Sequence, residues 1–238
     1  MKKPWNILVV IGALTIANLC LSQENGNERG AAERDRVQNS GQVLKEILDM
    51  PDTGIPKSVI KDCKCLIVLP SVKKVAVGIG GSYGRGLMTC RTGPDYKGAW
   101  SAPIMMESTG ANIGFQFGGQ ATDFVIAVMN DQGARSLLSN DVKLGGDASI
   151  AAGPVGRTAE ASTNVTMQAQ MLSYSRSRGV FGGVSLSGAT LGPDHNANEN
   201  LYGRKVTPEE IIAGKRPIPP SANQLIEVLN SQGHSAEK

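Results

Sequence analysis

One short segment has the spacing of a hydrolase nucleophile. Gly80-Gly81-Ser82-Tyr83-Gly84 fits the pattern G-x-S-x-G, in which the serine lies on a sharp turn between a strand and a helix. The residues that follow have the composition of a strand, and the later histidines, His195 and His234, stand in a loop-like segment and in the tail. We therefore interpret the segment as a glycine-rich hairpin. We predict no catalytic residue, and we expect that the protein is not an enzyme.

The cysteines and glycines offer little support for a bound metal or cofactor. Cys63, Cys65 and Cys90 lack paired histidines and the spacing of a structural zinc site. The glycines lack the Gly-Lys-Ser/Thr ending of a phosphate-binding loop. In an oxidising compartment, three cysteines suggest one disulfide and one remaining thiol. We predict a bond between Cys65 and Cys90, and the alternative is that all three thiols are free.

Basic residues recur at the ends of the segments with strand composition. If these ends share one edge of a sheet, the side chains form an anion-binding patch. The alternative is a solvated rim. A formal net charge of +3 argues against strong nonspecific binding to DNA, and we predict no nucleic-acid partner. The residues concerned are Lys73, Lys74, Arg85, Arg91, Arg176, Arg178, Arg204 and Lys205.

The first 22 residues have the features of a secretory signal peptide. Two lysines precede an apolar run from Ile7 to Ala17, which is shorter than the ~20 residues of a membrane span. A polar linker, residues 23–30, follows. We predict an exported protein, periplasmic or extracellular and peripheral to a membrane. A lipoprotein acylated at Cys20 is the alternative, but Leu19 stands where a small residue usually precedes such a cysteine.

Composition excludes several classes of protein. Of the 238 residues, 40% are apolar, which excludes a disordered chain. The aromatic content of 4% disfavours an aromatic platform for nucleic acid, and the presence of two histidines disfavours histidine-rich metal chemistry. Loss of Lys2 and Lys3 with the signal peptide would reduce the 24 basic residues to 22, against 21 acidic residues. The exported chain would then be nearly neutral.

Periodicity indicates helices near both ends of the chain. Residues 31–50 place apolar side chains at helical spacing. Such a helix could pack on the domain, or it could lie on lipid as an interfacial helix. Thr207, followed by Pro208 and by Glu210, is typical of a capped helix start. The last segment, residues 215–238, combines a Pro-rich stretch with a short helix or tail capped by Ser221.

Between these helices the sequence pattern is typical of a β-sheet. From Lys64 onward, short apolar runs alternate with glycine and polar clusters. Most of these runs lie too close together for a crossover helix, so antiparallel pairing is expected. Residues 132–140 form the one internal helical pattern. We predict an α+β fold, in which an antiparallel glycine-rich meander, with a barrel-like closure as one possibility, is flanked by helices at both ends.

Six blocks of residues share the motifs of one known family. They are Cys65–Arg91, Trp100–Pro103, Val128–Asp131, Asp141–Arg157, Ser173–Gly188 and Asn200–Gly203. These blocks resemble the SYLF lipid-binding domain family, which includes the eukaryotic actin-patch domain. The match covers roughly residues 31–214, in order, and it predicts a single SYLF-like domain over that range.

The resemblance implies binding rather than catalysis. Members of this family look like phospholipid binders, with phosphoinositides as ligands of eukaryotic members, and some members bind actin. For an exported chain, an anionic phospholipid surface of the cell envelope is the natural counterpart, and an envelope scaffold that binds protein partners is the alternative. The resemblance points to the N-terminal helix and a lysine pair as lipid-binding residues: Arg34, Arg36, Val37, Leu44, Lys45, Leu48, Lys73 and Lys74.

Overall fold

The structure is a computed structural model of the 238-residue chain. It describes residues 30–50, 54–77, 79–113, 118–156, 169–177, 180–184 and 186–233. The predicted signal peptide and almost all of the predicted polar linker lie outside the described residues. Every element discussed below therefore belongs to the region that follows them.

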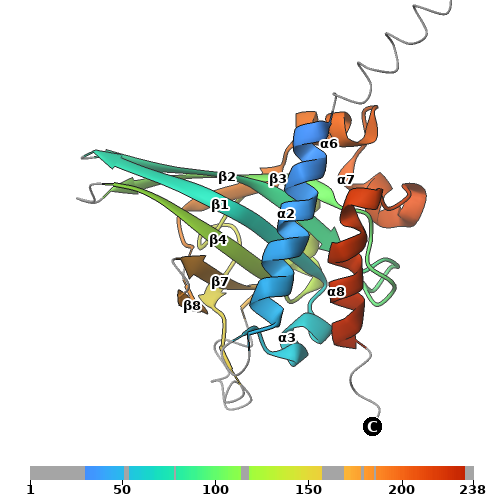
Figure 1. Ribbon diagram of the computed structural model, residues 1–238, viewed down its shortest axis with the longest axis horizontal. Helices are drawn as coiled ribbons and strands as arrows, with labels where there is room; N and C mark the ends of the chain where they lie inside the picture. The colour runs from blue at the N-terminus through green and yellow to red at the C-terminus, as the bar shows by residue number, and fades with distance from the viewer. Residues whose placement is uncertain are drawn as a thin grey trace, which may run out of the picture.

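One curled, mixed sheet dominates the described part of the chain (Figure 1). Its strands follow the order β5-β9-β3-β2-β1-β4-β7-β6, and β8 also pairs with β7. The pairing is antiparallel except between β6 and β7. The strands are β1 (Cys65–Val77), β2 (Ile79–Cys90), β3 (Ile104–Ile113), β4 (Gly118–Val128), β5 (Val142–Lys143), β6 (Ile150–Ala152), β7 (Met171–Ser177), β8 (Val180–Gly183) and β9 (Ala189–Pro193).

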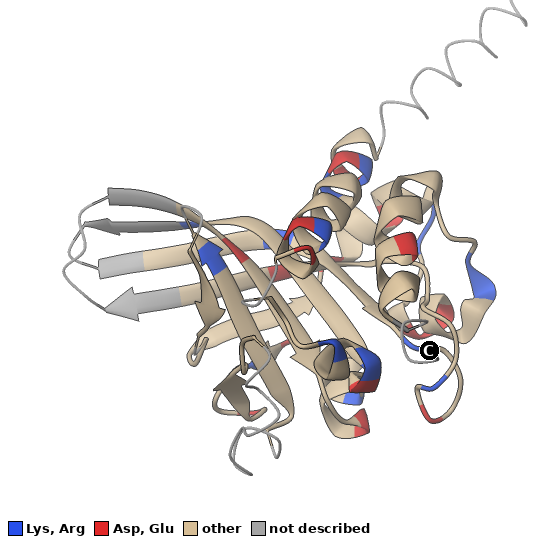
Figure 2. Ribbon diagram, turned by 60° about the horizontal axis from the view of Figure 1, so that its bottom comes forward, with Lys and Arg blue, Asp and Glu red and all other residues tan. Residues whose placement is uncertain are grey.

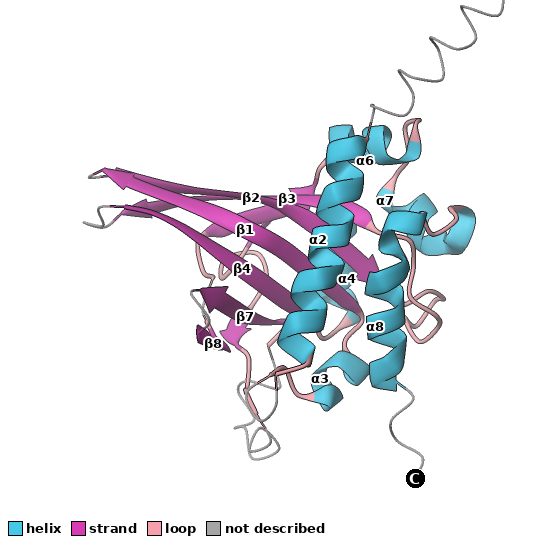
Figure 3. Ribbon diagram, viewed as in Figure 1, coloured by secondary structure: helices cyan, strands magenta, loops and turns pink. Residues whose placement is uncertain are grey.

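Helices cover both faces of the sheet near one of its ends (Figure 3). On one face, α2, α3 and α8 enclose a core that includes Leu44, Leu66 and Leu225. On the other face, α4 and the segment after α7 enclose a second core. The helical elements are α2 (Ala31–Leu48), α3 (Lys57–Asp62), α4 (Asp131–Ser139), α6 (His195–Tyr202), α7 (Pro208–Glu210), η2 (Ile211–Lys215), η3 (Pro220–Ala222) and α8 (Asn223–Gly233).

The α+β class and the flanking helices are confirmed, but the strands are longer and ordered differently than a meander of short runs predicts. Pro70 and Ser71 interrupt the apolar pattern without ending the strand. The register shifts around Ser71, which has a φ of 52°, so a bulge is built into one continuous β1. The fourth strand returns to pair with β1 instead of β3, so the β1–β2 hairpin lies between β3 and β4.

Local capping signals position the shorter helices. The Asn130 side chain accepts a hydrogen bond from the Gly133 N–H at 2.8 Å and begins α4. The Thr207 hydroxyl accepts one from the Glu210 N–H, as its sequence context predicts. The predicted cap at Ser221 is wrong, because η3 already begins at Pro220 and leads directly into α8. Among the described helices, none is long and apolar enough to cross a membrane.

Candidate functional site

The predicted lipid-binding helix, α2, packs its apolar face inside the protein. Val37, Leu44 and Ile47 are fully buried in the core shared with α8 and the sheet. Leu48, at the end of the helix, is half-buried. Insertion of this face into lipid is therefore the wrong mechanism for this fold, because the face already has a protein partner. The alternative interpretation, a helix packed on its own domain, agrees with the structure.

The cations of α2 do not form a basic stripe. Arg34 and Arg36 are half-buried, and acidic residues alternate with them (Figure 2). Lys45 is exposed, and its ammonium lies 2.5 Å from the Asp49 carboxylate one turn further on. The hydrogen bond to Asp49 and the charge of that group raise the pKa of Lys45. An exposed, paired lysine offers little attraction to an anionic surface.

The C-terminal half of α2 is tied to the sheet by Arg176 of β7. The Arg176 guanidinium contacts Asp123 of β4 at 2.8 Å and Glu46 of α2 at 2.5 Å. Burial opposes the charge of Arg176, but its hydrogen bonds to the two carboxylates raise its pKa. Hydrogen bonds from Gln42 and then from Arg176 lower the pKa of Glu46. This network joins three elements that are far apart in the sequence.

Lys73 lies at the root of a four-stranded extension of the sheet. The last pairings of β9 and β7 with the central strands are at Gly110 and Asp123. Beyond them, the described sheet consists of β3, β2, β1 and β4 alone, and Figures 1 and 3 show these strands extending past the helices. We call this part the arm; it comprises residues 72–77, 79–83, 111–113 and 118–122.

One cross-strand row marks the root of the arm. Thr109, Tyr83, Lys73 and Ala121 are consecutive partners across four strands. All four are exposed, and Tyr83 retains 45% of its accessible surface. Lys74 is the next residue of β1; the structure describes its backbone and not its side chain. The structure therefore separates the two halves of the predicted lipid site: the lysine pair belongs to the arm, whereas the other residues belong to α2.

The remaining basic residues do not gather into one patch. Arg85 pairs with Asp194 at 3.2 Å, and Arg204 lies 3.7 Å from Glu210. Arg178 lies outside the described residues. The prediction of a shared basic edge is wrong for Arg85 and Arg204, because Arg85 lies inside β2, Arg204 follows α6, and each has a carboxylate partner of its own. Arg91, in contrast, lines a separate cleft described below.

Ser82 does not lie in the context of a nucleophile elbow. It is part of β2, paired with Lys74 and with Gly110 in a continuous ladder. Its hydroxyl donates to the Gly110 carbonyl at 3.5 Å. A strand on both sides of the serine replaces the strand–turn–helix arrangement that exposes a nucleophile.

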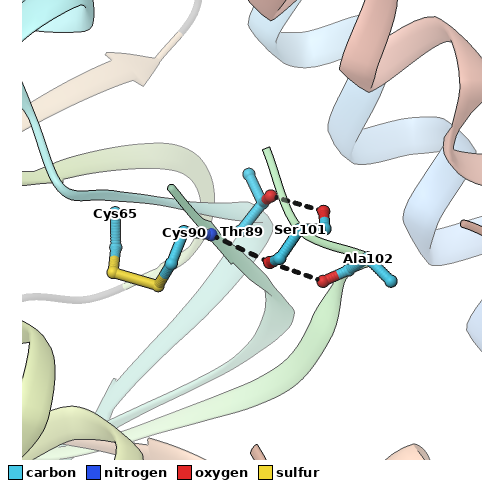
Figure 4. The surroundings of a disulfide bond; sticks show 5 residues. All are labelled: Cys65, Thr89, Cys90, Ser101 and Ala102. Atoms are coloured by element: carbon cyan, nitrogen blue, oxygen red, sulfur yellow. Dashed lines mark hydrogen bonds between the residues drawn. A yellow bond between two sulfur atoms is a disulfide. The ribbon is translucent and has the colours of Figure 1, made fainter. Parts of the chain in front are cut away.

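A disulfide joins the paired ends of β1 and β2 (Figure 4). It links Cys65 and Cys90, which face each other in the register of the two strands. Next to it, the Ser101 hydroxyl accepts from the Cys90 N–H at 3.1 Å, and the Thr89 hydroxyl donates to the Ser101 carbonyl at 2.8 Å. Cys63 is a buried free thiol. These contacts hold the strand ends in one arrangement.

The arm was not predicted from the sequence, although two runs without charged residues indicate it. Residues 75–84 and 108–122 contain no Asp, Glu, Lys or Arg. Each run alone resembles an ordinary glycine-rich strand pair. Their significance depends on the register that brings both runs into one sheet.

Comparison with known proteins identifies the family to which this chain is similar. A family described as Ysc84, Las17-binding protein actin regulator, matches residues 109–232. An SH3 domain-containing protein of Schizosaccharomyces pombe is 35% identical over 84% of this chain and 47% of its own length. Protein YSC84 of Saccharomyces cerevisiae is 34% identical over 76% of this chain and 38% of its length.

A human relative extends the likeness to animals. SH3 domain-containing YSC84-like protein 1 of Homo sapiens is 31% identical over 83% of this chain and 58% of its own length. The chain thus spans about half the length of the curated relatives it matches. These relatives and the matching family bear the names of binding or regulatory proteins. The chain belongs to the Ysc84 family, the SYLF domain family whose motifs run through its sequence.

Proposed function

We propose that this SYLF domain is a non-catalytic module that binds anionic phospholipid at a membrane surface through the outer end of the arm. The observation that carries the proposal is that the arm projects beyond the helices and contains two sequence runs without charged residues. The part of the arm beyond Lys74 lacks ionic side chains in both runs, so it can enter an interface where charged groups are costly.

The lysines at the root of the arm supply the attraction to headgroups. Lys73 is exposed and is followed by Lys74 in the sequence. From Lys73 to Val77 the strand rises ~13 Å, comparable with the ~5–10 Å depth at which peripheral elements enter the headgroup region. Lysines at this height can contact lipid phosphates while the outer strands lie among the upper acyl chains.

The open edges of the arm limit the depth of entry. In the arm, β3 and β4 each have one side without a strand partner among the described residues. Unpaired backbone N–H and C=O groups are costly in hydrocarbon but can be hydrated at the interface. The proposal is therefore shallow, peripheral binding. It fits an exported protein at an envelope membrane, and export itself is part of the proposal.

A protein partner is the second candidate. The matching family is described as Las17-binding and as an actin regulator, and this name favours a protein-binding role. Such a role predicts binding to a protein in the absence of lipid, and it does not require the two runs of the arm to lack charged residues.

Vesicle co-sedimentation of residues 23–238, which include every described residue, tests the lipid proposal. The vesicles are phosphatidylcholine alone and phosphatidylcholine with phosphatidylglycerol. Tyr83→Asp and Ala121→Asp each place a charge at an exposed position of the arm. We expect each to weaken binding to the anionic vesicles by about tenfold, and Lys73→Glu to do so as well.

Asn196→Asp is the matched control, because it adds the same charge at an exposed position of α6. It is expected to bind like the unaltered protein. Failure of the unaltered protein to sediment with either vesicle would exclude the lipid proposal. Full binding by both Asp variants would exclude the arm as the contact.

A further inference from the structure

A cleft of about 560 Å³ lies at the other end of β1 and β2 from the arm. It lies between the end of α3, the loop after β2 and the end of α8, about 40 Å along β1 from the outer strands. Its volume is typical of sites for small molecules. Four cationic residues line it, namely Lys61, Lys64, Arg91 and Lys97, against a single acidic residue, Asp62.

Arg91 is the most firmly held of these cations. Its backbone N–H donates to the Lys64 carbonyl at 2.8 Å, which fixes the two cationic residues side by side. Its guanidinium carbon lies 4.1 Å from the centre of the Trp100 ring, and Trp100 is buried. A guanidinium stacked on an aromatic face keeps its N–H edge available for an anion.

The framework behind Arg91 is rigid. The Cys65–Cys90 disulfide joins the residues that directly follow Lys64 and precede Arg91 (Figure 4). Ser101 pins the same strand end by its bond to the Cys90 N–H. Groups that are held in place before a ligand arrives lose less freedom on binding.

The loop after β2 carries two further residues to the cleft. The Thr92 N–H donates to the Ala99 carbonyl and the Gly98 N–H to the Thr92 carbonyl, each at 2.8 Å, which closes the loop. Tyr96, with a φ of 50°, occupies the left-handed region that bulky residues rarely adopt. This constrained turn brings Tyr96 and the exposed Lys97 to the cleft wall.

The positive character of the cleft is local. The whole chain has 24 basic and 21 acidic residues, so the excess of cations in the lining is not a property of the composition. The Lys64 ammonium lies 3.9 Å from the Asp131 carboxylate, which is beyond hydrogen-bond distance. Burial raises the pKa of the Cys63 thiol in the wall, so the thiol adds no negative charge to the cleft near neutral pH.

We propose that this cleft binds the phosphate group of a small, multiply charged ligand. Arginine and lysine are the side chains that recognise phosphate, with arginine giving directional hydrogen bonds, and one arginine and three lysines line this cleft. The distance from the arm separates this site from the membrane contact proposed above. The phosphate could belong to a soluble molecule or to a lipid headgroup, and the recognition chemistry is the same for both.

Calorimetric titration of the full chain with inorganic pyrophosphate tests the site. We expect binding that Arg91→Gln and Lys97→Gln each weaken by about tenfold. Lys97 is exposed on a loop, so its replacement leaves the fold intact even if the Arg91 variant is destabilised. Lys143→Gln, an exposed lysine in β5, is the matched control and should bind like the unaltered chain.

Competition then identifies the source of the phosphate. Displacement of pyrophosphate by vesicles containing phosphatidic acid, but not by phosphatidylcholine vesicles, supports a lipid headgroup; no displacement supports a soluble ligand. The arm variant Tyr83→Asp should retain pyrophosphate binding, so failure of the arm and failure of the cleft are distinguishable. Absence of pyrophosphate binding, or equal binding by the Lys97 and Arg91 variants and the unaltered chain, would overturn the proposal.

Discussion

Cys63 and Cys65 differ by two positions yet have different chemistry. Cys65 begins β1 and is bonded to Cys90, whereas Cys63 lies in the short connection after α3. The Cys63 thiol donates to the Ile60 carbonyl at 3.3 Å and is fully buried. Burial raises its pKa to about 12. It is therefore a structural thiol and a poor nucleophile, even though it lines a cleft.

This difference predicts the reactivity of Cys63. In the folded chain at mildly alkaline pH, alkylation of Cys63 should be at least about 100-fold slower than in urea, because both access and the thiolate form are lacking. Peptide mass spectrometry after iodoacetamide treatment measures the rate at this residue. The urea-unfolded chain is the control. Equal rates in the two states would show that the thiol is exposed in the folded protein.

At the scale of elements, α2 shows how one helical pattern can have two interpretations. Its apolar stripe was predicted from periodicity, but periodicity does not distinguish a protein partner from a lipid surface. Contact with α8 settles the choice: Gly41 of α2 lies so close to α8 that a Cβ there would be 3.1 Å from the Leu225 nitrogen. The helix therefore contributes to stability, and lipid binding is better sought on the arm.

Neighbouring substitutions on α2 test this assignment. Leu44→Ala should lower the free energy of unfolding by about 2–5 kcal/mol, because it leaves a cavity in the core. Lys45→Ala, the adjacent exposed position, should change it by less than about 0.5 kcal/mol. Urea unfolding measures both. If the two variants were equally stable, α2 would not be seated in the core as described.

At the scale of the whole molecule, Arg176 connects α2, β4 and β7. The Asp123 carboxylate that it contacts also accepts a hydrogen bond from the Ser71 N–H at 2.9 Å, at the bulge of β1. The network therefore lies where the helix-covered body gives way to the arm. Four elements meet at this junction, and none of the contacts is local in sequence.

Acid should weaken this junction. The pKa of Glu46 is lowered in the folded chain, so its ionised form contributes stability that is present above its ordinary pKa of 4.5 and is lost as pH falls through the lowered value. Arg176→Gln should destabilise the chain by about 1–2 kcal/mol near neutral pH. It should also reduce the loss of stability on acidification.

Urea unfolding over a series of pH values measures both effects. Arg135→Gln is the control, because Arg135 is an exposed residue whose pairing with Asp131 lies within one helix. An Arg176 variant that loses stability on acidification as steeply as the unaltered chain would contradict this account.

The sequence by itself determined the family and the α+β class, and it located most helices, such as residues 132–140 and the start at Thr207. These features rest on local patterns: apolar periodicity, caps and contiguous motifs. The tertiary structure alone decided that β4 pairs with β1, that the two uncharged runs form one arm, and that Lys64 lies beside Arg91. Such pairings join distant parts of the chain, and a local pattern is compatible with several partners until the sheet selects one.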